Sequence, residues 1–459
     1  MSLRNWQDIF KVNDIRGIYP TQLDEEAAFK IGKGLVKMVQ AKQVAIGRDG
    51  RLSSLPLFKA LSEGIMDNGS EVIDLGLVST DAFYFAMGKY NYPAGIMITA
   101  SHNPPQFNGF KICRQGPVML YEDNGLEQLK EVLIKNDIDN QSSLKGKIEK
   151  KDIIEEFIEH LISFINLQSL KNYRFGIDAS GGMAVSYLKL LISKLKGEFY
   201  FINDQIDGTF SCHSPNSFDP KSYSDLKKLI KDKKLDLGIL FDGDADRVTF
   251  LDETGEYVDA SIILILLIKH LMKNNTNEPV VYDSVLSPSV LKTINQFQGI
   301  PIRARIGHSF MKQAMREHNA LVGAEHTGHY YFRDLFFSDS GALTFLFVLE
   351  ILSEINKPLS VIKKEIDQRV RITEKNYQKG DNYEKQLDSI KDYYQNLGYQ
   401  IDVFDGLILE NKDTKIHIHP ANTAPFIRIN LEADDRDILL KREKELNNLL
   451  NSLNFVSIE

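Results

Sequence analysis

Ala94-Gly-Ile-Met-Ile-Thr-Ala-Ser-His-Asn-Pro-Pro105 is the stretch around which the rest of the chain is organised. Its first five residues are apolar or glycine and predict a buried strand. Asn103-Pro104-Pro105 ends regular structure, because proline lacks an amide donor and restricts the residue before it. We therefore expect Ser101 and His102 on a short loop at the end of a strand, where ligands bind in open α/β sheets.

The hydroxyl of Ser101 is the first candidate for chemistry. With His102 beside it and Lys111 a few residues on, it could carry a group covalently. The alternative is an ordinary turn in which the serine hydroxyl only forms hydrogen bonds to nearby backbone groups, because Ser, Asn and Pro are the usual turn residues. The stretch alone leaves both interpretations open.

Strands and helices alternate ahead of this loop. Apolar residues at helical spacing predict helices at 23–38 and 55–65, and short strands are expected at 43–47 and 71–75. The alternation predicts right-handed crossovers and a largely parallel sheet. A polar, lysine-rich stretch without an apolar stripe, 136–152, marks the first domain boundary.

The same strand-turn-helix theme returns twice, and a different pattern follows it. After a polar linker and a surface helix in 374–399, short strands precede a final helix at 438–450, which is typical of a small α+β domain. We therefore expect an α/β protein of four units, the first three with mostly parallel mixed sheets. The expected domains are 1–145, 146–250, 251–365 and 366–459.

Composition narrows the functional class. The chain has 459 residues, a net charge of −8 and two cysteines, Cys113 and Cys212. The negative balance argues against a general nucleic-acid binder, and two cysteines suit reduced thiols in a cytoplasmic protein. The amino end lacks the apolar core of a signal peptide. The longest apolar run, 262–268, is far shorter than the roughly 20 residues of a membrane span and predicts a buried helix.

Asp242-Gly-Asp-Ala-Asp-Arg247 is the most informative hexapeptide. It lies between two apolar runs that predict strands, and three carboxylates on a tight loop can converge on Mg²⁺ or Ca²⁺. An EF-hand loop is disfavoured, because its sixth position needs glycine and is Arg247 here. A charged turn without metal is also disfavoured, since neighbouring carboxylates repel one another. The hexapeptide predicts that Asp242, Asp244 and Asp246 bind a metal ion.

Basic residues near turns mark candidate anion sites. Arg305, Gly307 and His308 precede a predicted helix, which suits an anion, although an ordinary loop with a solvated arginine fits equally well. Asp14-Ile-Arg-Gly17 and Gly47-Arg-Asp-Gly-Arg51 each place arginine beside glycine, where phosphate oxygens can reach backbone amides.

Gly323-Ala-Glu-His-Thr-Gly-His329 offers groups suited to a sugar. We expect Glu325 and Thr327 on one face of an extended loop, where a carboxylate and a hydroxyl can grip vicinal sugar hydroxyls. His326 and His329 lie three residues apart outside any clear helix, so we expect structural roles for both.

Pro420-Ala-Asn-Thr-Ala-Pro425 is expected as a loop between strands. Asn422 and Thr423 could donate to a phosphate, and Arg428 could supply charge. A proline-rich hairpin without a ligand is the alternative. The sequence contains no P-loop, no Gly-x-Gly-x-x-Gly after a strand and no nucleophile elbow, which disfavours a nucleotide-dependent kinase or dehydrogenase.

In this order the motifs resemble those of the α-D-phosphohexomutases, most closely the bacterial phosphomannomutase/phosphoglucomutase branch. The match rests on the motifs quoted above at 14–17, 99–104, 242–247, 323–329 and 422–425. They span nearly the whole chain, with a signature in each of the four units. The resemblance implies four domains around a central cleft.

The resemblance also implies a reaction. Ser101 would be phosphorylated in the resting enzyme, and Asp242, Asp244 and Asp246 would hold Mg²⁺ with a phosphoserine oxygen. The phosphoserine would give its phosphoryl group to a hexose phosphate. The resulting hexose 1,6-bisphosphate, which also serves as activator, would turn end for end and return its other phosphate to Ser101.

By the same resemblance, positive charge comes from Arg16, Lys111 and Arg247, and Lys111 or His308 assists proton transfer. The catalytic candidates are Ser101, His102, Lys111, Arg247 and His308. The metal-binding candidates are Ser101, Asp242, Asp244 and Asp246. The substrate-binding candidates are Arg16, Arg247, Gly307, His308, Glu325, Thr327, His419, Asn422, Thr423 and Arg428.

The last domain departs from the family pattern. The family's phosphate loop usually begins with an arginine and carries a serine before its Asn/Gly-Thr, and His419 and Ala421 stand there instead. Neutral histidine is a weaker phosphate partner than the fork of arginine. Either Arg428 or another basic residue compensates, or phosphate affinity is low. Thr327 replaces the serine common in the nearest branch and keeps the hydroxyl.

The expected function is phosphomannomutase activity, the reversible interconversion of mannose 6-phosphate and mannose 1-phosphate. Phosphoglucomutase or dual-specificity activity is the alternative. A non-catalytic sugar-phosphate-binding relative is disfavoured by the intact Ser101 and the three aspartates, and aminosugar mutases usually carry a different sugar loop. We expect a hexose phosphate substrate, no nucleic-acid or membrane partner, and a monomer or weak homodimer.

Overall fold

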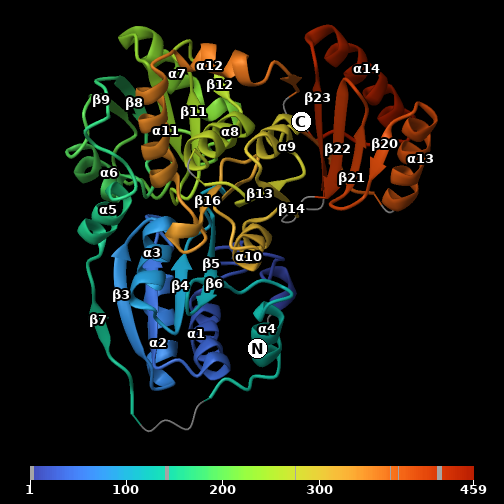
Figure 1. Ribbon diagram of the computed structural model, residues 1–459. Helices are drawn as coiled ribbons and strands as arrows, with labels where there is room; N and C mark the ends of the chain where they lie inside the picture. The colour runs from blue at the N-terminus through green and yellow to red at the C-terminus, as the bar shows by residue number, and fades with distance from the viewer. Residues whose placement is uncertain are drawn as a thin grey trace.

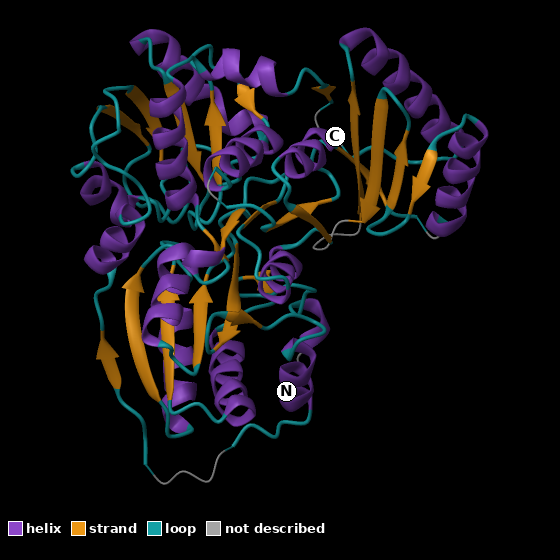
Figure 2. Ribbon diagram, in the orientation of Figure 1, coloured by secondary structure: helices purple, strands orange, loops and turns teal. Residues whose placement is uncertain are grey.

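The structure is a computed structural model and describes residues 5–139, 144–273, 275–372, 374–380, 382–420 and 426–458. Four sheets divide the described chain. In Figure 1 the first sheet stands at the bottom, the second and third lie above it, and the fourth is set apart to the right with its own two helices. Figure 2 shows helices beside each sheet, which is the four-domain α/β architecture expected from the sequence.

The first sheet contains the strand that precedes Ser101. Its strands are β1 (Ile15–Ile18), β2 (Gln43–Arg48), β3 (Glu71–Leu77), β4 (Ala94–Ile98), β5 (Phe107–Arg114), β6 (Val118–Met119) and β7 (Ile148–Lys150). β2 pairs in parallel with β3 and β4, and β3 with β7, whereas β1, β4 and β6 run antiparallel to β5. The helices are α1 (Glu25–Val39), α2 (Ser54–Asp67), α3 (Thr80–Tyr90) and α4 (Leu126–Ile134).

The second and third sheets are also mixed. The second domain has β8 (Arg174–Asp178), β9 (Glu198–Ile202), β10 (Leu237–Phe241), β11 (Val248–Leu251) and β12 (Tyr257–Val258), with α5 (Ile154–Ile162), α6 (Val185–Ile192) and α7 (Ser224–Lys233). The third has β13 (Pro279–Asp283), β14 (Ile300–Ala304), β15 (Val322–Ala324), β16 (Tyr330–Phe332) and β17 (Ser338–Asp339). Its helices are α8 (Ala260–Leu271), α9 (Pro288–Gln296), α10 (His308–Glu317), α11 (Gly341–Ile355) and α12 (Leu359–Ile366).

These three sheets share one topology. In each, a first strand pairs in parallel with a second and a third, and the third turns back into an antiparallel fourth. The sets are β2-β3-β4-β5, β8-β9-β10-β11 and β13-β14-β15-β16. The turn from third to fourth strand carries Ser101, the three aspartates and Glu325, respectively. Three motifs that look unrelated in sequence therefore occupy equivalent places, at the carboxyl ends of parallel strands.

The fourth sheet is antiparallel throughout. It consists of β18 (Val370–Arg371), β19 (Lys375–Gln378), β20 (Gln400–Asp402), β21 (Leu407–Glu410), β22 (Thr414–Pro420) and β23 (Phe426–Ala433), packed against α13 (Tyr383–Asn396) and α14 (Arg436–Ser452). Ile416 and Ile418 of β22 face these helices, so alternation turns Lys415, His417 and His419 to the opposite face. That polar face lies against the third domain, because Lys415 Nζ donates to Leu286 O.

One core cluster runs through the first three domains, while the rest of the first domain and the fourth domain have clusters of their own. One cluster of buried apolar side chains includes Phe83, Tyr187 and Leu264, whereas Ile418 and Leu446 belong to the fourth domain's own cluster. The apolar helix α8 is buried, as predicted. Within the described ranges, every helix is too short or too polar to cross a bilayer.

Several local expectations need correction. The stretch 374–399 begins with a strand, β19, rather than a linker, because it pairs with β23. β7 lies in the polar stretch 136–152 and pairs with β3. Since β7 and β12 extend the first and second sheets, we propose that these domains end later than 145 and 250, near 151 and 258.

Candidate active site

Ser101 lies at the carboxyl end of β4, on the loop to β5. Its hydroxyl donates to Asp242 Oδ2 at 3.0 Å and lies 3.3 Å from His102 Nδ1. The residue is 1% exposed, and its φ of 51° is left-handed. Such backbone is uncommon outside glycine and clusters at functional loops. The hydroxyl of the first domain thus meets the aspartate loop of the second.

Close approach of these two loops depends on a glycine. A Cβ placed on Gly243 would lie 2.6 Å from Ser101 O, which is closer than real Cβ contacts allow. Only glycine fits between the flanking aspartates without moving the Ser101 loop.

Arg51 holds the Ser101 loop in shape. Its guanidinium donates, at 2.7–3.1 Å, to four loop carbonyls, those of Ser101, Asn103, Pro104 and Phe107. Asp49 Oδ2 lies 3.0 Å from Arg51 Nε and balances its charge. Arg48, at the start of the same turn, pairs with Asp74 at 2.6 Å. The guanidinium groups of Arg48 and Arg51 therefore bind carbonyl and carboxylate groups of the protein and do not face a phosphate.

Arg16 contacts the same loop from β1. It donates to Ala100 O at 3.0 Å and to Asn103 Oδ1 at 2.7 Å, and it pairs with Asp14 Oδ2 at 2.8 Å. The charge of Arg16 thus lies beside Ser101, as a phosphate-binding role requires.

The three aspartates converge in the way that a cation site needs. Asp242, Asp244 and Asp246 are buried, and each offers an oxygen within 4.8 Å of the others. Asp244 Oδ1 and Asp246 Oδ1 have no hydrogen-bond partner among the described residues. Buried carboxylate oxygens without donors are costly, and a divalent cation would satisfy them. Burial, together with the charges of Asp244 and Asp246, raises the pKa of Asp242 well above its usual range.

Lys111 of β5 supplies part of the balancing charge. Its Nζ lies 2.8 Å from Asp244 Oδ2 and 2.5 Å from Asp246 Oδ2. Burial works against the charged form, but the two carboxylates outweigh it and raise the pKa of Lys111. Thr80, the first residue of α3, donates to Asp244 Oδ2 at 2.6 Å. The first domain therefore positions the second domain's carboxylates.

Arg247 and His102 form a pair next to the Ser101 hydroxyl. Arg247 Nη2 lies 2.8 Å from His102 Nδ1, and Arg247 Nε lies 3.7 Å from Asp242 Oδ2. Burial, and then the charge of Arg247, lowers the pKa of His102 well below its usual range. His102 is neutral at pH 7 and accepts a hydrogen bond from Arg247.

The predicted sugar loop of the third domain adjoins the start of α10. Glu325 Oε1 accepts from Gly307 N at 2.8 Å, and Oε2 accepts from Tyr331 Oη at 2.5 Å. His308 Nε2 lies 3.9 Å from Asp14 Oδ2, and burial lowers the pKa of His308. Thr327 is half-buried. Both oxygens of Glu325 already accept bonds within the protein, which fixes the carboxylate in place.

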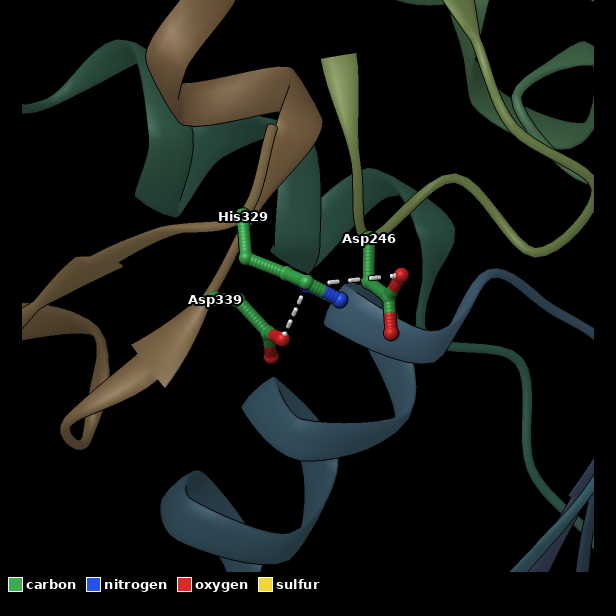
Figure 3. A group of neighbouring side chains, drawn as sticks. All are labelled: Asp246, His329 and Asp339. Carbon is green, nitrogen blue, oxygen red and sulfur yellow. Dashed lines mark ion pairs between the residues drawn. The ribbon is translucent and has the colours of Figure 1, made fainter. Parts of the chain in front are cut away.

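His329, for which the sequence predicts a structural role, lies beside the three-aspartate cluster. Figure 3 shows its ring between Asp246 and Asp339, with Nδ1 2.8 Å from Asp339 Oδ2 and 3.8 Å from Asp246 Oδ1. Lys312 Nζ lies 2.8 Å from Asp339 Oδ1. Burial opposes ionisation of Asp339, but Lys312 and His329 lower its pKa. No local motif singles out Lys312 or Asp339.

The fourth domain brings two candidates toward the sugar loop. The ring of His419 lies 6.4 Å from that of His326, and Arg428 Nε lies 3.5 Å from Glu374 Oε1. Burial above all lowers the pKa of His419 to about 4, so its ring is neutral at pH 7. The other predicted members of this loop, Ala421, Asn422 and Thr423, lie outside the described residues.

Comparison with known proteins agrees with this geometry. Phosphoglucomutase/phosphomannomutase alpha/beta/alpha domains I, II and III match residues 7–137, 155–255 and 259–369. A solved phosphoglucomutase/phosphomannomutase family protein from Burkholderia thailandensis superposes with a TM-score of 0.88 at 27% identity, covering 97% of this chain and 98% of that one.

Curated relatives extend the match to the fourth domain. A phosphomannomutase of Methanocaldococcus jannaschii is 30% identical and one of Vibrio cholerae is 31% identical, each over 97% of this chain and 98% of the relative. Similarity at that level over the whole of both chains, with the serine and aspartate loops facing each other, makes this chain a mutase that belongs to the phosphoglucomutase/phosphomannomutase family of α-D-phosphohexomutases.

Proposed function

We propose that the chain interconverts mannose 6-phosphate and mannose 1-phosphate through a phosphoserine at Ser101 and a hexose 1,6-bisphosphate. The observation that carries the proposal is the buried Ser101 hydroxyl, 3.0 Å from Asp242 Oδ2, where the first three domains meet. In the first half-reaction the oxygen–phosphorus bond to Ser101 breaks as one to a sugar oxygen forms. In the second, the other sugar oxygen–phosphorus bond breaks as the bond to Ser101 forms again, so no other phosphoryl donor is consumed. Phosphoryl transfer depends mainly on positioning and charge neutralisation, which this junction supplies.

Asp242, Asp244 and Asp246 would hold the Mg²⁺ ion. Oxygen-only ligation suits this hard cation, and the two unpartnered oxygens of Asp244 and Asp246 support it. Bound there, the ion would neutralise charge on the phosphoryl group being transferred.

Basic side chains of the protein would supply the remaining positive charge. Arg247 and Arg16 flank Ser101, and Lys111 keeps the aspartates from repelling one another. Asp339 Oδ2, 2.8 Å from His329 Nδ1, would orient the His329 ring beside the aspartates. Glu325, Gly307, His308 and Thr327 would orient the sugar.

The test is turnover of mannose 1-phosphate and glucose 1-phosphate side by side, with Mg²⁺ and a trace of glucose 1,6-bisphosphate. We expect conversion of mannose 1-phosphate to the 6-phosphate, and the ratio of the two kcat/KM values identifies the preferred sugar. Phosphate release without isomer formation would contradict the proposal, as would conversion of glucose 1-phosphate alone. Cytoplasmic location and a monomer or weak homodimer remain part of the proposal.

Arg51→Lys is expected to lower kcat about tenfold or more and the free energy of unfolding by about 2–4 kcal/mol. Lysine cannot reach four carbonyls from one planar fork, so the Ser101 loop loses its shape. The measurements are steady-state turnover and urea unfolding. Arg48→Lys is the control, because Arg48 bonds Asp74 away from the loop and its loss should leave kcat within about twofold. Equal losses of kcat in both variants would contradict the assignment.

His419→Arg is expected to lower KM for mannose 1-phosphate about fivefold, with little change in kcat. A charged fork replaces a ring that is neutral at pH 7, and one charge-assisted contact contributes about 1 kcal/mol. His419→Gln, also neutral, serves as the control and should keep the native KM. An unchanged KM in His419→Arg would show that this position does not meet a substrate phosphate.

A further inference from the structure

A large cavity lies between the third and fourth domains, behind the Glu325 loop. It encloses about 670 Å³ and is lined by parts of the second, third and fourth domains and by the segment that joins the last two. His326 lines it, whereas Ser101, the three aspartates and Glu325 are absent from its described lining. The cavity is therefore distinct from the site at which the phosphoryl group would be transferred. Its size falls within the usual range for small-molecule sites.

One wall of this cavity holds a buried ammonium group without a carboxylate partner. Lys415 is 9% exposed and projects from the polar face of β22. Its Nζ donates to Leu286 O at 2.8 Å, and no carboxylate oxygen of the described residues lies within ion-pair distance of it. Burial lowers the pKa of Lys415. A buried charge matched only by a carbonyl is costly unless an anion joins it.

Two carboxylates in the lining of the cavity already form ion pairs with arginine side chains, whereas Glu410 faces Lys415 across the sheet without an ion pair to it. Glu432 forms ion pairs with Arg369 at 3.1 Å and with Arg371 at 3.0 Å. Asp367 forms an ion pair with Arg371 at 2.8 Å. The described lining holds five lysine and arginine side chains, Lys415 among them, against four carboxylates, so the cavity has a surplus of positive charge.

Another part of the lining is aromatic. The rings of Tyr223 and Tyr257 are stacked at 6.2 Å with 13° between their planes, and Phe218 meets Tyr257 edge-on at 6.4 Å. All three rings line the cavity. Aromatic faces bind flat apolar groups, so the cavity combines a surface for a ring with a fixed positive charge.

We propose that this cavity binds a small organic anion, a phosphate or carboxylate attached to a flat ring. The anionic group pairs with Lys415, and the ring packs against Tyr257 and Phe218. The occupant contacts Leu286 of the third domain and Lys415 of the fourth at once, so it links these two domains. The binding does not depend on the sugar that the enzyme converts.

The test uses 8-anilinonaphthalene-1-sulfonate, an aromatic anion whose fluorescence rises on binding, with the full-length protein. We expect saturable binding to the native chain. Lys415→Met should weaken it about tenfold or more, because the charged contact is lost while the length of the side chain is kept. Lys412→Met removes an exposed lysine on the neighbouring turn and should leave the affinity unchanged.

Two further measurements keep the outcome decisive. Lys415→Met removes an unmatched buried charge, so its melting temperature should equal or exceed the native value. Tyr257→Leu should weaken the probe independently through the aromatic wall, and it decides the question if Lys415→Met fails to fold. Absence of saturable binding to the native chain overturns the proposal. So does native affinity in Lys415→Met and Tyr257→Leu, or an equal loss in Lys412→Met.

Discussion

Ser101→Ala is expected to lower kcat/KM about 10⁴-fold or more for both mannose 1-phosphate and glucose 1-phosphate. The hydroxyl is the atom that would carry the phosphoryl group, and no other group can take that place without moving the loop. The fold should persist, because alanine differs from serine only by the hydroxyl, and its bond to Asp242 is one of several that hold the loop. Turnover, together with intact-mass measurement of the phosphorylated protein, checks the result.

A second buried serine provides the matched control. Ser62 of α2 is buried, and its hydroxyl has no hydrogen-bond partner in the part of the chain that the structure describes. Ser62→Ala should therefore keep native turnover and native phosphorylation. If Ser101→Ala keeps a tenth of the activity, or if phosphate is found on another residue of that variant, the phosphoserine assignment is wrong.

The sequence predicts those parts of the fold whose signal lies within a short stretch. The apolar run before Ser101 is β4, and the run before Asp242 is β10, because buried parallel strands are apolar on both faces. The motif loops are recognisable because each packs its reactive side chains into a few consecutive residues.

Elements without a periodic pattern were not predictable in this way. α11 is buried at almost every position and α3 over most of its length, so neither has the polar face that marks an amphipathic helix. β19 was not predictable for a different reason: Tyr377 is its only buried residue, so the strand has no alternating apolar pattern.

Part of the site escaped prediction because its members are far apart in the chain. Thr80 meets Asp244 across 164 positions, and Arg51 meets Ser101 across 50. Thr80 is an ordinary polar residue in its local sequence, and Arg51 is expected from the sequence to meet a phosphate rather than the carbonyls of the Ser101 loop. The folding of the first domain brings Arg51 to the Ser101 loop, and the packing of that domain on the second brings Thr80 to Asp244.

Asp244→Asn is expected to lower kcat about 10³-fold or more and to abolish the stabilisation of the protein by Mg²⁺. The native chain should melt at a higher temperature as Mg²⁺ is added, because a ligand that binds only the folded state stabilises it. Asparagine has the shape of aspartate and can still accept from Thr80 and Lys111, so the metal-free variant should fold. Asparagine offers one negative charge fewer to the cation. Of the two buried oxygens that lack partners among the described residues, only Asp246 Oδ1 then remains a carboxylate oxygen, because an amide group replaces the carboxylate of Asp244.

Asp252→Asn is the control, since Asp252 is buried but pairs with Lys363 outside the three-aspartate cluster. That variant should lose stability and keep its response to Mg²⁺. A native-like rise in melting temperature with Mg²⁺ in Asp244→Asn would place the metal elsewhere, and full turnover after removal of Mg²⁺ with a chelator would exclude its role in the reaction.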